Sequence, residues 1–198
     1  MRPAAGLGHL ARCTALACAL AEEGFALETR ALGASTELEL DGMRWLPEGA
    51  ETAGAEPDVL VLDTYDERDW DRLASTPHGR LVAFEDALPR PEAADVVIAP
   101  EPPDGRDGRL LGGLRFACLR RDFWDLPRRR IAAEPRALLV TTGGSDLDGL
   151  AGRIVAALAE RLPAIAIELV WGPAFAGEPP LGVTVLEQPR SLHEPLLR

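Results

Sequence analysis

Cysteine is scarce in this sequence. The 198 residues include three cysteines, Cys13, Cys18 and Cys118. An odd number of cysteines at scattered positions does not make a disulfide framework, and no two of them have the spacing of metal ligands. The cysteine content therefore excludes a disulfide-rich secreted domain and a cysteine-based metal centre. We expect reduced, mostly buried thiols and a cytoplasmic location.

Long apolar runs are also missing. The run from Ala15 to Ala21 is too short to span a membrane and is followed at once by Glu22 and Glu23. The first residues lack the basic region and the long apolar core of a signal peptide. We therefore expect neither a membrane-spanning segment nor a membrane partner.

Basic residues are fewer than acidic residues. The chain has 21 Lys and Arg residues against 32 Asp and Glu residues, which gives a formal net charge of −11. This balance argues against a nucleic acid or an anionic membrane surface as the main partner. A phosphorylated small molecule remains compatible with it, because the N–H groups at a helix N-terminus can bind phosphate locally.

Apolar residues, in contrast, make up 46% of the chain, enough for a packed core. They form short runs that alternate with helical patterns, which is typical of α/β proteins with parallel sheets. The predicted strands are Phe25–Leu32, Met43–Leu46, Asp58–Asp63, Arg80–Phe84, Asp95–Ala99, Leu114–Leu119, Ala137–Thr142, Ile165–Trp171 and Val183–Leu186. The predicted helices are Leu10–Glu23, Glu67–Ala74, Leu150–Leu162 and one that begins at Ser191. The segment between Pro100 and Gly113 is rich in proline and glycine and is predicted to be a loop.

These elements divide into two parallel-sheet domains. We place the first at residues 1–120 and the second at 136–198, joined by a charged bridge over 121–135. No strand precedes the first glycine loop, although such a loop normally follows one. We therefore expect that the chain starts after the first strand of its fold and that its second domain is incomplete.

Two glycine-rich loops lead into helices. Gly6-Leu7-Gly8-His9 precedes the first helix, whose apolar stripe is expected to comprise Leu10, Cys13, Leu16, Ala17 and Leu20. Gly143-Gly144-Ser145 follows a strand of the second domain, and Asp63-Thr64-Tyr65 follows a strand of the first. Because ligands bind at the carboxyl ends of parallel strands, we predict a site where these three segments converge. We expect the imidazole of His9 to face a gap, with the serine-bearing turn on its far side.

Five motifs in this order resemble one family. They are Gly-x-Gly-His-x-x-Arg-Cys from Gly6, a strand ending Asp-x-Tyr at Tyr65, a strand ending in Glu85-Asp86, Gly-Leu-Arg-Phe-Ala-Cys-Leu-Arg-Arg-Asp-Phe from Gly113, and Thr-Thr-Gly-Gly-Ser-Asp from Thr141. The chain resembles, over about residues 6 to 190, the UDP-sugar hydrolases of pseudaminic acid biosynthesis and their spore-coat polysaccharide relatives. The resemblance implies two Rossmann-like domains in the glycosyltransferase-B arrangement.

The resemblance also implies roles for single residues. Water would attack the anomeric carbon of a UDP-linked diacetamido-trideoxy sugar with inversion, and His9 would act as the general base or orient that water. Tyr65 would position the water or the sugar. Gly6, Gly8, Arg12 and Asp63 would line the substrate site, and Gly143, Gly144 and Ser145 would hold the diphosphate. No metal, cofactor or nucleic acid is implied, and we expect a monomer.

Structural roles compete with several of these assignments. Arg12 is expected to pair with an acid such as Asp63 rather than to bind phosphate. Asp63 itself is as readily a brace for its loop as a ligand contact, and Tyr65 can be read as a cap on the sheet edge. Asp86 and Asp146 are expected to brace loops. His78 and His193 have no motif support and are predicted to be surface residues.

The chain departs from the family in three places. No strand precedes Gly6, Glu85-Asp86 stands where two aspartates are expected, and the sequence ends before the second Gly-Gly-Thr segment and the glutamate that hold uracil and ribose. Two alternatives therefore stand beside the hydrolase. One is a UDP-sugar-dependent glycosyltransferase of the same fold, and the other is an inactive remnant that binds nucleotide sugars.

Overall fold

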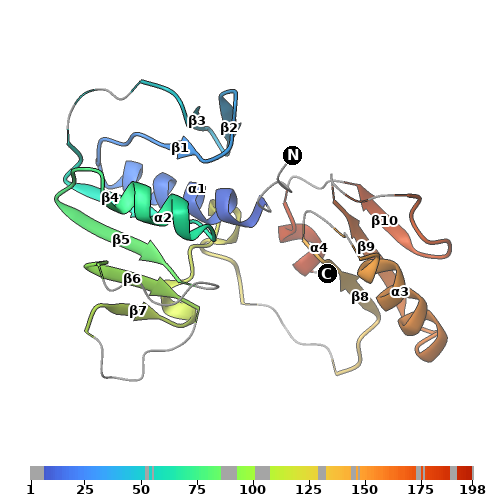
Figure 1. Ribbon diagram of the computed structural model, residues 1–198. Coiled ribbons are helices and arrows are strands. Elements are labelled where there is room, and N and C mark those ends of the chain that lie inside the picture. Colours follow the sequence, from blue (N-terminus) through green and yellow to red (C-terminus); the bar gives the residue numbers. More distant parts are fainter. Residues whose placement is uncertain are drawn as a thin grey trace. The chain divides into compact units, whose positions relative to one another are not determined.

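The computed structural model describes residues 7–51, 54, 56–85, 93–100, 108–128, 133–143, 146, 148–172, 175, 177–187 and 191–197. Helices and strands alternate along this part of the chain, and most strand pairs are parallel, so the fold is α/β (Figure 1). The chain divides into two compact units, one over His9–Arg120 and the other over Arg121–Arg198 together with Met1–Gly8. No helix within the described part is long and apolar enough to cross a membrane.

The elements of the His9–Arg120 unit begin with a helix that starts just before it. In order they are α1 (Leu7–Glu22), β1 (Arg30–Ala31), β2 (Leu38–Leu40), β3 (Met43–Pro47), β4 (Val59–Leu62), α2 (Glu67–Ala74), β5 (Arg80–Phe84), β6 (Val96–Ala99), β7 (Leu110–Gly112) and the 3-10 helix η1 (Leu114–Phe116). The remaining elements are the 3-10 helix η2 (Arg121–Phe123), β8 (Ala137–Val140), α3 (Leu150–Arg161), β9 (Ala166–Trp171), β10 (Thr184–Glu187) and α4 (His193–Leu197).

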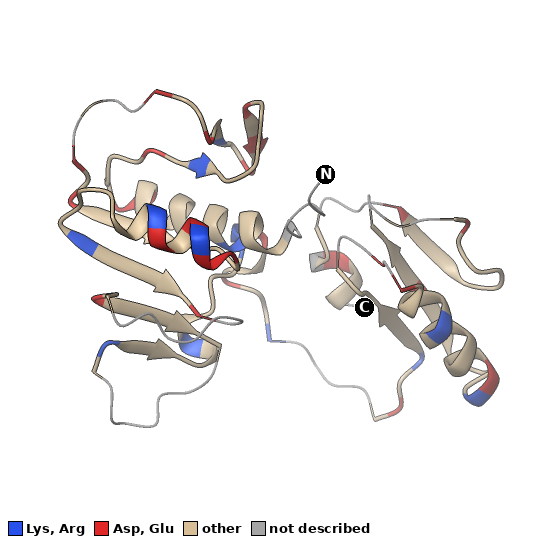
Figure 2. Ribbon diagram, in the orientation of Figure 1, with Lys and Arg blue, Asp and Glu red and all other residues tan. Residues whose placement is uncertain are grey.

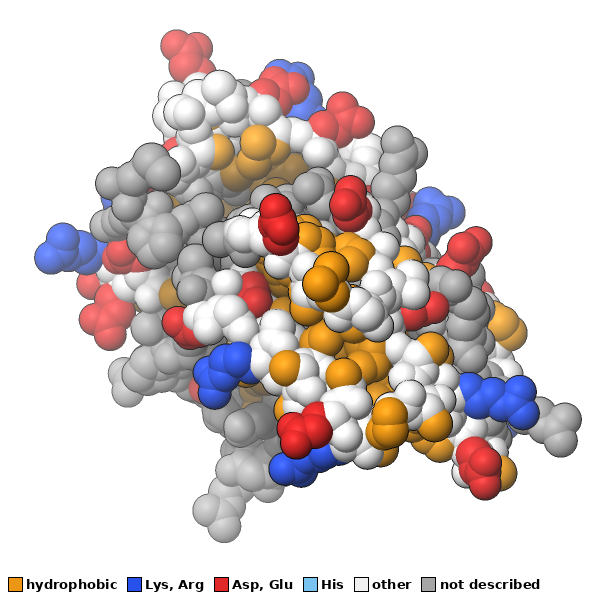
Figure 3. Space-filling view, turned by 90° about the vertical axis from the view of Figure 1, so that its right-hand side faces the viewer, with side chains coloured by type: hydrophobic (Ala, Val, Ile, Leu, Met, Phe, Trp, Pro, Cys, Tyr) orange, Lys and Arg blue, Asp and Glu red, His pale blue; other side chains and the backbone are white. Residues whose placement is uncertain are grey.

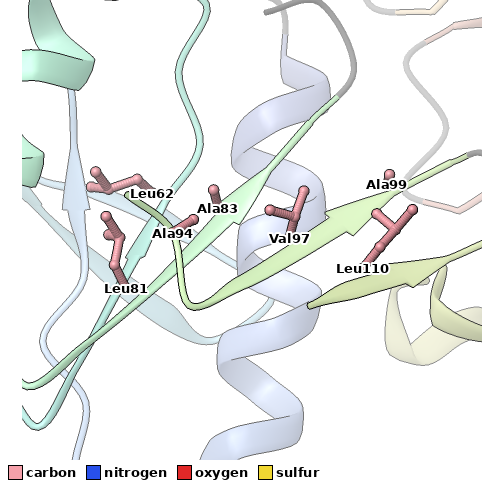
Figure 4. Close-up of a cluster of buried hydrophobic side chains, with 7 residues drawn as sticks. All are labelled: Leu62, Leu81, Ala83, Ala94, Val97, Ala99 and Leu110. Atoms are coloured by element: carbon pink, nitrogen blue, oxygen red, sulfur yellow. The ribbon is translucent and has the colours of Figure 1, made fainter. Parts of the chain in front are cut away.

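A four-stranded parallel sheet with the order β4-β5-β6-β7 forms the centre of the first unit. Its strands are short apolar runs, and their inward side chains form one buried cluster (Figure 4). The cluster comprises Leu62, Leu81, Ala83, Ala94, Val97, Ala99 and Leu110, and Trp70 and Leu73 of α2 pack against it. Because consecutive strands run in the same direction, the carboxyl ends of β4 and β5 lie at one edge of the sheet.

α2 illustrates how local sequence sets these elements. Asp66 is its N-cap, and the carboxylate accepts hydrogen bonds from the backbone N–H groups of Arg68 and Asp69. The helix carries both signs of charge on its outer face (Figure 2). Trp70 and Leu73 face the sheet, so the helix is amphipathic and its span is predictable from sequence.

A second sheet of the same unit, with the order β1-β3-β2, is mixed, because β2 and β3 form an antiparallel pair. Trp45 of β3 is buried, and its Nε1 donates to Thr14 Oγ1 of α1 over 3.0 Å. The Thr14 hydroxyl in turn donates to the Leu10 carbonyl over 2.7 Å. The helix therefore lies between this small sheet and the four-stranded sheet (Figure 1).

Gly79 is required at the start of β5 for a steric reason. A Cβ atom at this position would lie 2.5 Å from the backbone carbonyl oxygen of Asp58, which is far inside van der Waals contact. We expect Gly79→Ala to lower the free energy of unfolding by about 1–3 kcal/mol, because the backbones that begin β4 and β5 must separate. Chemical denaturation monitored by circular dichroism measures this loss.

Gly152 provides the matched control for that substitution. It lies inside α3, and a Cβ atom there would meet nothing within 4 Å. Gly152→Ala is expected to raise the free energy of unfolding by about 0.5–1 kcal/mol, since alanine restricts the unfolded chain more than glycine does. Equal stability of the two alanine variants would contradict the steric argument.

The second unit contains a three-stranded parallel sheet with the order β10-β9-β8. α3 packs on it through Ala151 and Val155, which join Val140, Ile167 and Leu169 in a buried cluster. Several large apolar side chains of this unit are nevertheless exposed, among them Leu150, Leu162, Leu181 and Leu196. Figure 3 shows hydrophobic side chains gathered on one face of the molecule, between acidic ones.

Most of the predicted elements are confirmed. The helix predicted at Glu67–Ala74 and the strand predicted at Arg80–Phe84 have the predicted bounds as α2 and β5. The strands predicted at Asp58–Asp63 and Ala137–Thr142 are slightly shorter, as β4 and β8. Elements with continuous apolar runs are thus well marked in the sequence.

Two strand predictions are wrong. Of the segment Phe25–Leu32, only β1 is a strand, and Phe25 is 59% exposed, so its alternating pattern does not mark a buried face. The strand that completes the main sheet is β7, inside the segment predicted to be a loop, and residues 114–116 form η1 instead. β7 is a strand because it pairs with β6. A pattern of three residues is too short to predict such a pairing from the sequence.

The first helix also differs from its prediction. It begins at Leu7, so Gly8 lies in its first turn and not in a loop. Of the expected apolar stripe only Ala17 is buried, while Thr14 and Ala15, which are outside the stripe, are buried more completely. Sheets on two sides of α1 bury more of its surface than a single stripe, which is the physical reason for the difference.

Candidate functional site

Asp63 organises a polar cluster at the carboxyl end of β4. Its side chain is 4% exposed, and two residues of the first turns of α1 contact it. His9 Nδ1 lies 2.5 Å from Asp63 Oδ1, and Arg12 Nε lies 2.5 Å from Asp63 Oδ2. Arg12 Nη2 also donates to Oδ1, so the guanidinium binds both oxygens of the carboxylate. The expected pairing of Arg12 with an acid is therefore confirmed.

The contacts of Asp63 fix the tautomer of His9. An ionised carboxylate only accepts hydrogen bonds, so the imidazole nitrogen 2.5 Å from Oδ1 must carry the proton. Arg12 Nη2 also lies 3.1 Å from His9 Nδ1. With the proton on Nδ1, both nitrogens are donors, and both donate to the same acceptor, Asp63 Oδ1. A neutral imidazole held in this way keeps its lone pair on Nε2.

The pKa of Asp63 reflects opposing causes. Burial raises it, but hydrogen bonds from Arg12 and His9, together with the charge of Arg12, outweigh burial and hold the pKa below the ordinary value for aspartate. The carboxylate is therefore ionised throughout the neutral range, which the tautomer of His9 requires.

Acid should destabilise the fold through this group. The pKa of Asp63 is lower in the folded chain than the value of about 3.9 for an unfolded aspartate. Its contribution to stability is therefore fully present above about pH 4 and is lost as the pH falls through the lower, folded value. Urea unfolding at a series of pH values measures the loss. In Asp63→Asn, the free energy of unfolding should depend less on pH below pH 4. The same pH dependence in that variant and in the native chain would show that Asp63 is not the group responsible.

Arg12 has a further partner on the neighbouring strand. Its guanidinium lies 4.8 Å from the centre of the Phe84 ring, at the end of β5. This cation–π contact and the bidentate pair with Asp63 hold the arginine from two sides. The sequence analysis did not predict that Phe84 belongs to the site. Its position at the end of a predicted strand, next to the expected site, was the feature that could have indicated it.

Two of the three cysteines lie near the cluster. The Cys13 thiol donates to Asp63 Oδ2 over 3.3 Å, and Cys118 is close enough to interact with the charges of Arg12 and Asp63. Burial raises the pKa of Cys13, and the Asp63 charge raises it further. Burial likewise raises the pKa of the Cys118 thiol. Both side chains are therefore protonated thiols rather than nucleophiles, and all three cysteines are free.

Tyr65 packs on the imidazole of His9. The two ring centres are 3.9 Å apart and the planes meet at 71°, an edge-to-face contact. The His9 side chain is 14% exposed, and its Nε2 is buried without a hydrogen-bond partner. The expectation that the imidazole faces an open gap is therefore wrong for this conformation, because neighbouring side chains cover the ring.

Only some of the predicted glycine and serine residues of the site are described by the structure. Gly6, Gly144 and Ser145 lie outside the described residues. Gly8 is exposed on α1, and a Cβ atom there would meet nothing within 4 Å. Gly143 follows β8 with a φ of +91°, a conformation that favours glycine. The structure thus brings His9, Arg12, Asp63 and Tyr65 together, whereas Gly143 belongs to the other unit.

Asp146 lies just before α3 and binds its first backbone N–H groups. Its carboxylate oxygens accept hydrogen bonds from the backbone N–H groups of Leu150, over 2.8 Å, and Ala151, over 3.0 Å. The expected loop-bracing role is confirmed. Because these two donors already have an anionic acceptor, a phosphate at this helix start would have to displace Asp146 or use the amides that precede it.

His78 lies outside this cluster. His78 is partly exposed, and its Nδ1 lies 2.6 Å from the Thr76 carbonyl oxygen. His193 begins α4, and Asp86 is outside the described residues. No group of three or more His, Cys, Asp or Glu residues in the described part of the chain could hold a metal ion. Comparisons with protein-family models, with curated proteins and with solved structures gave no match.

Proposed function

We propose that the chain is a nucleotide-sugar hydrolase with two Rossmann-like domains in the glycosyltransferase-B arrangement. In this proposal it acts in the cytoplasm, as a monomer, and releases UDP from a UDP-linked diacetamido-trideoxy sugar in nonulosonic acid or surface polysaccharide biosynthesis. The substrate comes from the family resemblance of the five motifs. The role of His9 has separate support in the geometry of its contacts.

The observation that carries the proposal is the contact between His9 Nδ1 and Asp63 Oδ1 at the carboxyl end of β4. A carboxylate that holds Nδ1–H orients the ring and leaves Nε2 as a proton acceptor, which is the arrangement a general base requires. Arg12 supports it by holding both carboxylate oxygens, so that Asp63 stays ionised and in place.

In this proposal, water displaces the diphosphate at the anomeric carbon. Water oxygen forms a bond to the anomeric carbon, the bond from that carbon to the diphosphate oxygen breaks, and Nε2 of His9 takes the proton from water. The products are UDP and the free sugar with inverted configuration. We assign the diphosphate to the segment Gly143-Gly144-Ser145, because glycine lets the backbone approach a ligand closely and Gly143 has a positive φ, which favours glycine.

A second candidate function has an observation in its favour. Nε2 of His9 is buried, so no water reaches it in this conformation. A protein that binds nucleotide sugars without turnover, with the Asp63 cluster acting only as a brace, fits that burial directly. A glycosyltransferase would need the same accessible Nε2 as the hydrolase, and no contact within the described residues favours it.

Product analysis separates these functions. The purified chain is incubated with the UDP-diacetamido-trideoxy sugar, and the products are resolved by anion-exchange chromatography. Equal amounts of UDP and free sugar support the hydrolase. UDP release only when a sugar acceptor is added identifies a transferase. Binding in calorimetry with no UDP release identifies the binding protein and rejects the hydrolase.

A further inference from the structure

The four-stranded sheet of the first unit has an open edge at β4. The strand order β4-β5-β6-β7 leaves the side of β4 away from β5 without a neighbouring strand among the described residues (Figure 1). The Asp58 carbonyl accepts the Arg80 N–H over 2.8 Å, so the backbone groups of Asp58 face β5. In a parallel pair every second residue of a strand bonds to the same neighbour. The N–H and C=O groups of Val59 and Val61 therefore face the open edge.

The composition of β4 is that of a strand inside a sheet. The sequence Val-Leu-Val-Leu is a continuous apolar run, which is typical of parallel strands with a neighbour on each side. It contains no charge and no proline, which are features by which edge strands avoid pairing with other chains. Val59 is nevertheless 50% exposed. Within the described part of the chain, no hydrogen bond satisfies the outward backbone groups of Val59 and Val61, so this side of β4 is available to a further strand.

A second strand of the same unit is open in a similar way. β1 pairs only with β3 among the described strands, and the apolar Phe25 and Leu27 that precede it are 59% and 39% exposed. β4 differs from β1 because it leads directly to Asp63, which binds His9. A segment that pairs with β4 therefore lies beside the polar cluster, and this edge is the one whose occupation bears on the site.

We propose that the open edge of β4 binds an extended apolar peptide segment as an added strand. The segment runs parallel to β4, as all strand pairs of this sheet do, and is held mainly through its backbone. Its apolar side chains match those of Val59 and Val61. Glu56 and Asp58, just before β4, are exposed, so basic residues at the amino end of the segment complement their charge. This binding does not depend on the proposed hydrolase function.

A synthetic peptide tests the open edge directly. The probe has two lysines followed by alternating valine and isoleucine residues, with fluorescein at its carboxyl end. The control peptide has two adjacent prolines at its centre, so that one missing N–H faces β4 in any register. Fluorescence anisotropy should show saturable binding of the probe to the native chain. The control should bind about tenfold more weakly or worse, because it loses a backbone hydrogen bond and cannot lie flat against the strand.

Val61→Pro makes the corresponding change in the protein. It removes an N–H that faces outward and leaves the hydrogen bonds to β5 in place, which is the position where edge strands tolerate proline. Probe binding should weaken about tenfold or more. Val61→Ala keeps the N–H and should bind the probe nearly as well as the native chain does. If Val61→Pro does not fold, the control peptide and hydrogen exchange of the native chain still decide.

Amide hydrogen exchange measured by NMR locates the bound peptide. In the native chain alone, the amides of Val59 and Val61 should exchange faster than those of Leu60 and Leu62, which bond to β5. The probe should protect Val59 and Val61 and leave the other two unchanged. Protection of Val59 and Val61 before the probe is added means that the edge is already occupied, and the proposal fails.

Three other results would overturn the proposal. Equal binding of the probe and the control peptide means that side chains or charge, and not the strand edge, bind the peptide. An absence of binding up to about 1 mM probe means that the edge does not accept a strand. A dimer in sedimentation whose formation protects Val59 and Val61 identifies a second copy of the chain as the occupant. None of these measurements involves UDP release, so a failure of the hydrolase proposal is distinguishable from a failure of this one.

Discussion

Replacing Asp63 with alanine is expected to lower the free energy of unfolding by about 3 kcal/mol, near the lower end of the range for breaking a buried ion pair. The substitution removes both contacts of Arg12 with the carboxylate, and it leaves His9 Nδ1–H without its acceptor. The Asp63 side chain is 4% exposed and the Arg12 side chain is 23% exposed. Water can therefore solvate part of the arginine charge after the carboxylate is removed. Denaturant unfolding monitored by circular dichroism measures the loss.

A surface ion pair supplies the control for Asp63. Glu37 and Arg44 form a contact of 2.6 Å on the hairpin of β2 and β3, and their side chains are 48% and 68% exposed. Exposed pairs contribute little because water screens them, so Glu37→Gln should leave the unfolding midpoint almost unchanged. If Asp63→Ala and Glu37→Gln have the same effect, the cluster at the end of β4 does not hold the fold together.

Replacing His9 with asparagine is expected to reduce UDP release by about 10²–10⁴-fold, the usual contribution of a general base. Asparagine is the informative substitution, because its amide nitrogen can take the place of Nδ1 and donate to Asp63, while nothing replaces Nε2. The variant should therefore retain most of its stability and lose its activity. The initial rate of UDP formation at saturating substrate measures the effect.

A control variant and the stability of His9→Asn show whether the loss of activity is catalytic. His78→Asn removes a histidine outside the cluster and should leave the rate unchanged. Retention of more than a tenth of the native rate in His9→Asn would remove His9 as the base and favour a role in bracing Asp63. Loss of both stability and activity would indicate that the asparagine does not restore the hydrogen bond, and circular dichroism distinguishes that case from a catalytic loss.

The site was only partly readable from the sequence. The position of Asp63 and Tyr65 after an apolar strand, and of His9 and Arg12 at the start of a helix, was enough to predict that these residues belong to one edge of a parallel sheet. The pairing of Arg12 with an acid followed from charge. Phe84, Cys13 and Cys118 were not assigned to the site, because their contacts depend on how β5 and the segment after η1 approach α1.

By itself, the sequence determined the class of fold and most of its elements. Apolar runs bounded by charged residues mark β4, β5 and β6, and the Asp66 cap and amphipathic pattern mark α2, because these signals act between residues that are neighbours in the chain. Tertiary structure alone decided that β7 rather than residues 114–119 completes the main sheet. It alone decided that α1 is covered on two sides and that the ring of Tyr65 packs edge-to-face on the imidazole of His9. Those outcomes depend on contacts between residues that are not neighbours in the chain, from 13 positions apart for Val97 and Leu110 to 54 positions apart for His9 and Asp63, and such contacts leave no periodic pattern in the sequence.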